Sequence, residues 1–154
     1  MVQFISGASD VAITLKEFSD KIHWAWEETY HRGNIDALDE IYAHDVVIHV
    51  PPFPDEKGVD SYKRHAAEAL QLYTNIRYDW EEIIGEGNTI VDRFTMHMKH
   101  TGTSQRLNVP PTGKDLTVKC CRIVHVKDGK IVEEFNYSDL LGLFQQLGIV
   151  PQMG

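Results

Sequence analysis

The chain has 154 residues, enough for one domain with its own core and without a structural metal or disulfide. Its net charge of −8 argues against binding to nucleic acids or anionic membranes, because both need clustered Lys and Arg. We therefore expect a single domain over residues 1–154 whose partner is a small or uncharged molecule.

The composition also favours a cytoplasmic location. The first ten residues lack a basic segment followed by an apolar core, and no stretch approaches the roughly 18 apolar residues of a membrane span.

The two cysteines, Cys120 and Cys121, are neighbours in a predicted strand, so their side chains point to opposite faces. We expect both to be reduced packing residues.

Helices are predicted in the first half of the chain. Apolar residues recur at three- and four-residue spacing between residues 13 and 30, and Gly33 follows as a stop signal. A second, short helix is predicted over 35–42 behind Asn34 as its cap, and a third from 60 or 61 to about 73.

Strands dominate the second half. One is predicted at 46–50, between the helices, and the others at 77–84, 89–99, 116–125 and 131–137. Helices first and hairpin-linked strands afterwards predict an α+β fold in which an antiparallel sheet curls over the helices.

Near the C-terminus, a lone carboxylate follows the last predicted strand. Asp139 stands before the apolar stretch 140–144, and burial raises the pKa of a carboxyl group towards the range useful for proton transfer. Asp139 is therefore a candidate base. The pair Ser138-Asp139 also fits the N-cap of a short final helix. The residues alone leave both interpretations open.

The order of elements is matched by a set of residues at characteristic positions. They are Gly33-Asn34-Ile35-Asp36, His49, Pro51, Gly58, Arg93, Thr95, His100, Gly102, Pro110 to Lys114, Asp128 to Ile131, Phe135, Asp139 and Gln146-Leu147-Gly148. With this set the chain resembles the SnoaL-like polyketide cyclases, which share the nuclear transport factor 2-like fold.

The resemblance implies a cone of strongly curved antiparallel sheet, also described as a cystatin-like α+β barrel, with helices closing one side over a deep apolar pocket. It implies Asp139 as the catalytic base and His125, on the preceding strand, as a residue that holds substrate oxygens or orients Asp139. Two departures leave the substrate open. Phe135 replaces the usual Trp, and Met98-Lys99 the usual Gly-Thr.

The turn at Asp128-Gly129 decides whether His125 can serve this site. A two-residue turn would pair His125 with Val132, on the face opposite Asp139. A three-residue loop with Gly129 in the left-handed conformation would pair His125 with Ile131 and place His125, Phe135 and Asp139 on one face. We predict the second arrangement, which also places Arg122 opposite Glu134.

The implied chemistry is proton removal beside a carbonyl, followed by intramolecular aldol closure or by isomerisation of a small hydrophobic carbonyl compound. It needs no cofactor. The alternative is a binding or association module without catalysis, because one fold supports many functions. The fold also carries isomerases, dehydratases, epoxide hydrolases and hydroxylases.

Further residues are expected around the ligand. His49 is either a ligand contact or a strand-edge residue, and Met96, Met98 and His100 form a stripe that lines the pocket if it faces inward. The remaining candidates are Phe53, Trp26, Phe135 and Tyr137.

Neither a metal site nor a monomer is expected. The chain has 8 histidines, but no spacing among them forms a recognised metal-ligand set. Val118, Cys120 and Val124 suggest an apolar sheet face left outside the pocket, and hence a sheet-to-sheet homodimer.

Overall fold

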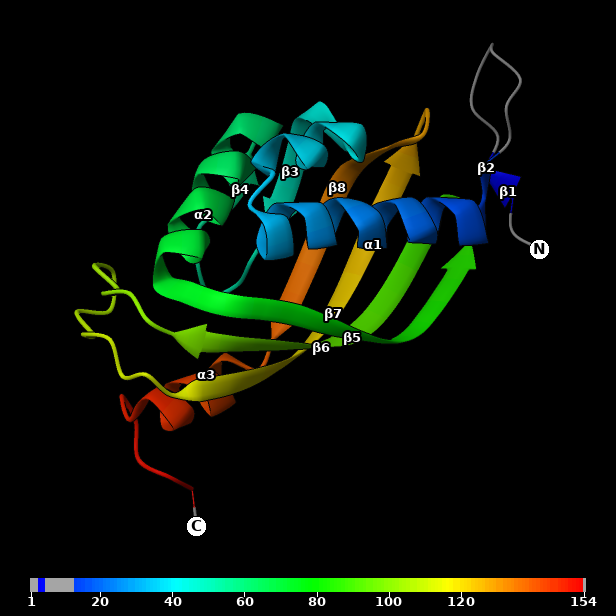
Figure 1. Ribbon diagram of the computed structural model, residues 1–154. Coiled ribbons are helices and arrows are strands. Elements are labelled where there is room, and N and C mark those ends of the chain that lie inside the picture. The colour runs from blue at the N-terminus through cyan, green and yellow to red at the C-terminus, as the bar shows by residue number, and fades with distance from the viewer. Residues whose placement is uncertain (1–2, 5–12, 154) are drawn as a thin grey trace.

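The computed structural model describes residues 3–4 and 13–153, and it has helices before a run of long strands (Figure 1). The elements, with the 3₁₀ helix labelled η1, are β1 Gln3–Phe4, β2 Ile13–Thr14, α1 Leu15–Arg32, η1 Ile35–Glu40, β3 Tyr42–His49, β4 Glu56–Lys57, α2 Val59–Leu72, β5 Tyr73–Glu86, β6 Thr89–His100, β7 Asp115–Lys127, β8 Lys130–Ser138 and α3 Leu140–Leu147. None of the helices in these residues is long and apolar enough to cross a membrane.

Helix α1 has defined signals at both ends. The Thr14 hydroxyl accepts a hydrogen bond from the Glu17 backbone N–H, and the Glu17 carboxylate accepts one from the Thr14 N–H, which makes a capping box. Gly33 ends the helix with φ 78°, a left-handed conformation that glycine adopts without strain. The predicted second helix is wrong in type and length, because η1 ends at Glu40 and Tyr42 already belongs to β3.

The strands form a six-stranded sheet in the order β4-β3-β8-β7-β6-β5, with β4 and β5 at its two open edges. The sheet curves around α1 and α2, which lie on its concave side (Figure 1). Register shifts in β5, between Thr74 and Arg77 and between Trp80 and Glu82, accompany the bend of this strand. The predicted α+β class and curved sheet are confirmed.

One neighbouring pair of strands departs from the expected antiparallel pattern, since β3 and β8 are parallel. The chain leaves β3, crosses by α2 to the far edge at β5, and returns through three antiparallel strands to lie beside β3. A parallel pair needs such a long connection. The first and last long strands thus become neighbours in the middle of the sheet.

The concave face is apolar along most of β7. Val118, Cys120 and Val124 are at most 5% exposed and belong to the core that α1 and α2 cover. The expectation that these three residues form an outer association surface is therefore wrong. The register pairs Met96 with Val118 and Met98 with Leu116, so the methionine stripe faces inward.

The β7–β8 hairpin differs from the predicted register. Asp128 and Gly129 both have positive φ, 51° and 71°, as in the two-residue turns whose twist suits a hairpin. A bulge beyond the turn pairs His125 with Glu133, not with Ile131. A two-residue turn alone would pair His125 with Val132, on the opposite face from Phe135. The bulge adds one residue to β8, so His125 lies on the same face as Phe135. Arg122 lies opposite Asn136 rather than Glu134.

The C-terminal helix α3 covers the part of β7 that extends past β8. The Gln146 side-chain amide accepts a hydrogen bond from the Thr117 backbone N–H at 2.9 Å and donates one to the Thr117 carbonyl at 2.8 Å. One side chain thereby replaces a missing strand residue at this position.

Candidate active site

Three charged residues interrupt the apolar concave face. Asp92 on β6, Arg122 on β7 and Glu134 on β8 are 3%, 0% and 0% exposed. Asp92 lies directly across from Arg122 in the register. Buried charges are costly unless they are paired and hydrogen-bonded, so their partners indicate what the cluster is built to do.

Arg122 is held by both an ion pair and aromatic rings. Its Nε donates to Asp92 Oδ1 at 3.0 Å, and its Nη2 donates to Asp92 Oδ2, which makes a two-pronged contact. The guanidinium carbon lies 4.2 Å from the centre of the Trp26 ring and 5.4 Å from that of Phe94. These contacts fix the cation in one orientation.

Glu134 is the carboxyl group best suited to proton transfer. The Tyr42 hydroxyl donates to Glu134 Oε2 at 2.5 Å, and Trp26 Nε1 donates to the Tyr42 oxygen at 3.3 Å. Burial raises the pKa of Glu134, although Arg122 and the Tyr42 hydrogen bond oppose this. A carboxylate with a raised pKa is a stronger base than an ordinary solvated carboxylate.

Four buried side-chain atoms around this cluster have no hydrogen-bond partner among the described residues. They are Arg122 Nη1, Glu134 Oε1, Tyr78 OH and His23 Nε2. An unsatisfied buried polar atom costs about 1–3 kcal/mol, so such atoms call for a water or a ligand. Together they offer a cationic donor, a carboxyl oxygen, a phenol and an imidazole nitrogen.

The His23 ring belongs to the same environment. It stacks on Trp80 with the ring centres 3.9 Å apart, and the Arg122 guanidinium carbon lies 6.0 Å from the Trp80 ring centre. Burial, followed by the charge of Arg122, lowers the pKa of His23. The neutral ring is therefore favoured, and it can accept or donate one hydrogen bond at Nε2.

Three of the sequence-predicted residues meet on the other, outer face of the sheet. His49 Nε2 contacts Glu133 Oε1 at 3.0 Å, and His125 Nδ1 contacts Glu133 Oε2 at 3.0 Å. The Phe135 ring stacks on His49 with the centres 4.5 Å apart. The structure thus brings His49, His125 and Phe135 together around Glu133.

Asp139 lies apart from both groups. It is exposed and caps α3, with its carboxylate accepting a hydrogen bond from the Gly142 N–H at 2.8 Å. The burial expected of this carboxylate is not observed, because the chain turns into α3 directly after β8. The contact of His125 is Glu133, six residues before the expected partner Asp139. The catalytic roles of Asp139 and His125 stay predictions.

The remaining predicted ligand contacts are divided between the two faces. Trp26, Met96, Met98 and His100 lie on the concave side, and the Thr112 N–H donates to His100 Nδ1 at 3.3 Å, which places the proton of a neutral ring on Nε2. Tyr137 is on the outer face and 49% exposed.

Phe53 lies outside both groups, in the loop between β3 and β4. The guanidinium carbon of Arg106 is 4.7 Å from the centre of its ring. This contact joins the loop after β3 to the long loop before β7.

The sequence interpretation missed Asp92, Arg122, Glu134 and Tyr42 as site residues. A usable signal was present in the alternation of β7, where Arg122 occupies an inward position in an otherwise apolar row. Asp92 interrupts the row of Ile90 and Phe94 in the same way. Charged residues at inward positions of a sheet mark a functional cluster more directly than the end of a strand.

The curved sheet and its covering helices form a nuclear transport factor 2-like fold. The chain belongs to the SnoaL-like polyketide cyclase family, which matches it over residues 21–147. No curated protein matches the chain at a significant level. Within the residues described, no group of three or more His, Cys, Asp or Glu side chains is arranged to hold a metal ion.

Solved structures share the fold at low sequence identity. TsrD from Streptomyces laurentii has a TM-score of 0.78 and 19% identity, covering 90% of this chain and 99% of its own. A SnoaL-like protein from Jannaschia sp. CCS1 has a TM-score of 0.79 and 16% identity, with coverages of 94% and 100%. IdmH from Streptomyces antibioticus has a TM-score of 0.70 and 24% identity, with coverages of 86% and 99%.

Proposed function

We propose that the protein is a cofactor-independent enzyme that moves a proton at carbon beside a carbonyl group, and so cyclises or isomerises a small hydrophobic substrate. The single observation that carries the proposal is the pair of unpartnered atoms Glu134 Oε1 and Arg122 Nη1 in one buried network. One is an acceptor for a substrate proton, and the other a donor for a substrate oxygen.

The chemistry follows from these two atoms. The Glu134 carboxylate removes a proton from the carbon beside the carbonyl, and Arg122 Nη1 donates to the enolate oxygen as its charge grows. In a cyclisation, the enolate carbon bonds to a second carbonyl carbon of the same molecule, and the new alkoxide takes the proton back from Glu134. In an isomerisation, the proton returns to a different carbon.

The surroundings support this assignment. Trp26, Trp80 and Phe94 surround the cation with aromatic surface, and such walls suit an apolar ligand with one polar end. A single positioned base contributes roughly 10²–10⁴-fold to such a reaction. For a substrate whose protons beside the carbonyl are already acidic, this contribution from a single base is sufficient.

The second assignment of the base is Asp139, with His125 as its partner. It is supported by the family resemblance of these two positions, and it places the reaction at the β8–α3 junction. The two assignments differ in which carboxylate, when neutralised, stops proton transfer.

The experiment is deuterium exchange into 1-tetralone, a bicyclic aryl ketone, followed by NMR in D₂O. We expect the protein to accelerate exchange and Glu134→Gln to reduce the acceleration about 100-fold or more. Asp139→Asn and the exposed control Glu86→Gln should keep it. Loss only in Asp139→Asn would move the base to the β8–α3 junction.

The alternative is a binding module of the same fold. It predicts that 1-tetralone quenches the fluorescence of the buried Trp26 without any accelerated exchange in the wild type or the variants. We further propose that the protein acts in the cytoplasm as a homodimer joined through the outer face of the sheet. That face carries the partly exposed Ile123, Phe135 and Tyr137.

A further inference from the structure

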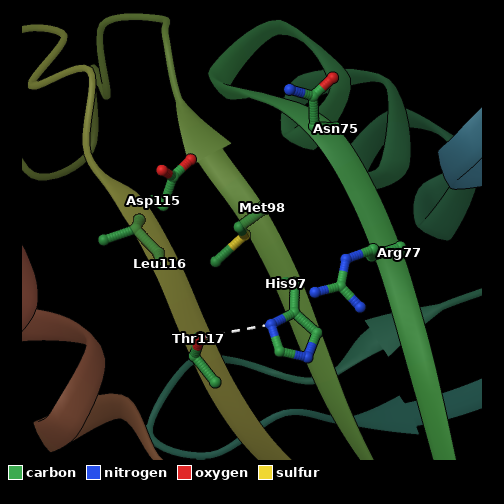
Figure 2. A pocket seen from close by; sticks show the side chains of 7 residues that line it. All are labelled: Asn75, Arg77, His97, Met98, Asp115, Leu116 and Thr117. Carbon is green, nitrogen blue, oxygen red and sulfur yellow. Dashed lines mark hydrogen bonds between the residues drawn. The ribbon is translucent and has the colours of Figure 1, made fainter.

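A groove lies on the opposite side of the sheet from the concave cluster, across β5, β6 and β7 (Figure 2). It has a volume of about 160 Å³, and its polar lining residues are Asn75, Arg77, His97, Asp115 and Thr117. Met98 and Leu116 of the inward-facing rows also line it. Arg77, His97 and Thr117 are cross-strand neighbours in the register, so they form one row over three strands. The proposed concave site uses none of these residues.

His97 in this row connects a carboxylate outside the row, that of Asp79, to the hydroxyl of Thr117. Asp79 Oδ2 lies 2.7 Å from His97 Nε2, and Thr117 Oγ1 lies 3.4 Å from His97 Nδ1 (Figure 2 shows the second contact). The series follows the order of an activated nucleophile, in which an acid orients a base and the base contacts a hydroxyl. Such contacts are often looser before a substrate binds.

The Asp79 carboxylate fixes the tautomer of His97. A carboxylate only accepts, so His97 Nε2 carries the proton and Nδ1 presents its lone pair. The Thr117 hydroxyl then donates to Nδ1, which is the arrangement that removes a proton from a hydroxyl nucleophile. Two hydrogen bonds between the Gln146 side-chain amide and the Thr117 backbone, one in each direction, hold Thr117 in place.

Arg77 supplies a cation beside this series. One of its N–H groups donates to Asp79 Oδ1 at 3.2 Å, and the guanidinium lies next to the His97 ring (Figure 2). A guanidinium has five N–H donors, so others can face an oxyanion that forms above Thr117.

The contacts among Arg77, Asp79, His97 and Thr117 are not explained by a contribution to the stability of the fold. Arg77 and Asp79 are 61% and 56% exposed at their side chains, and ion pairs between such exposed groups contribute little to folding. Four polar side chains nevertheless share one ordered chain of contacts around a groove. Asn75, also on the groove, has a φ of 54°, an uncommon conformation for a residue other than glycine.

We propose that this groove is a second catalytic site, which transfers a small acyl group from an ester to Thr117 and then to water. Thr117 is the nucleophile, His97 the general base and Asp79 the residue that orients His97. The volume fits a short acyl group, and the adjacent Arg77 suits the oxyanion of the carbonyl under attack.

Each step balances. Thr117 Oγ1 bonds to the ester carbonyl carbon while its proton passes to His97 Nδ1, and the resulting oxyanion faces Arg77. The bond to the alcohol breaks, and the leaving oxygen takes the proton from His97. Water then attacks the acylated threonine, gives a proton to Nδ1, and the acid leaves as Thr117 Oγ1 regains that proton.

The test uses p-nitrophenyl acetate with the full chain. We expect a rapid release of about one nitrophenolate per chain, and an acetyl group on Thr117 in peptide mass spectra. Thr117→Val should abolish both signals, His97→Gln should slow the release about 100-fold or more, and Asp79→Asn should slow it less. Thr103→Val, at another exposed threonine, is the matched control and should behave as the wild type.

Two outcomes would overturn the proposal. One is wild-type protein without acetyl on Thr117. The other is an undiminished release in Thr117→Val with intact secondary structure, which would place the reaction on lysines. Glu134→Gln separates the two sites, because it should leave acetylation of Thr117 unchanged even where it stops proton exchange into 1-tetralone.

Discussion

The Tyr42 hydroxyl donates a 2.5 Å hydrogen bond to Glu134 Oε2 although the two residues are far apart in sequence. The parallel pairing of β3 with β8 makes this contact possible, because it puts the first and last long strands side by side. Removal of the hydroxyl in Tyr42→Phe takes the 2.5 Å hydrogen bond away from the buried Glu134 carboxyl group. We expect a loss of about 1–3 kcal/mol in the free energy of unfolding, measured in urea.

The same carboxyl group makes stability depend on pH. Burial raises the pKa of Glu134 above its value in the unfolded chain. The folded state therefore holds the proton more tightly, and stability is lost as pH rises through the folded pKa. Glu134→Gln should gain stability relative to the wild type as pH increases from the ordinary carboxyl range. A constant difference across pH, measured by thermal unfolding, would contradict this.

The buried ion pair of Asp92 and Arg122 should be more sensitive than any surface pair. Asp92→Asn leaves the Arg122 cation buried without its counter-charge, and breaking such a pair costs about 3–5 kcal/mol. Asp20→Asn is the matched control, because it breaks the exposed pair of Lys16 and Asp20, and solvent-exposed pairs contribute little to stability. Equal losses in urea titrations would argue against the assigned burial.

His49 should titrate above an ordinary histidine. Its two ring nitrogens contact Glu133 and Asp55, and both contacts need an N–H, so the ring is held as the cation. These hydrogen bonds, first that of Glu133 and then that of Asp55, raise the pKa of His49. The stabilisation is complete below the pKa that His49 has in the unfolded chain, as long as both carboxylates are ionised, and it disappears as pH rises through the folded pKa. NMR titration should show a lower pKa for His49 in Asp55→Asn.

The proposed homodimer can be tested at the outer face. Tyr137 is 49% exposed there, next to Cys121 in the register. We expect sedimentation at micromolar concentration to show a dimer for the wild type and a monomer for Tyr137→Lys, because a lysine would be desolvated at the interface. Trp24→Lys, at an exposed position on α1, should keep the dimer.

Much of the fold could be predicted because local signals agreed with it. The apolar spacing of α1 and the glycine at position 33 defined the first helix to within two residues at each end. The type of η1 and the early start of β3 could not be read, because Tyr42 faces the core through contacts with β8 and α2. Such contacts between distant segments leave no local pattern in the sequence.

The site was predicted less well, for a related reason. His125 and Phe135 lie on one face as expected, because the β7–β8 register sets both. His49 joins them through the parallel pairing of β3 with β8, which the sequence interpretation did not foresee. Their face and their partner Glu133 depend on a single bulge, which shifts every later side chain to the other side. The exposed position of Asp139 depends on where β8 stops and α3 begins.

The Gln146 amide protects the protein from aggregation through the end of β7. Where a strand extends beyond its neighbour, its backbone N–H and C=O groups can pair with an extended segment of another molecule. Such unpaired edges promote aggregation. Gln146 occupies these groups at Thr117 with a side chain that cannot be extended further. Helix α3 therefore blocks strand pairing at this end of β7. Removal of the helix would expose the β7 backbone to pairing with other molecules.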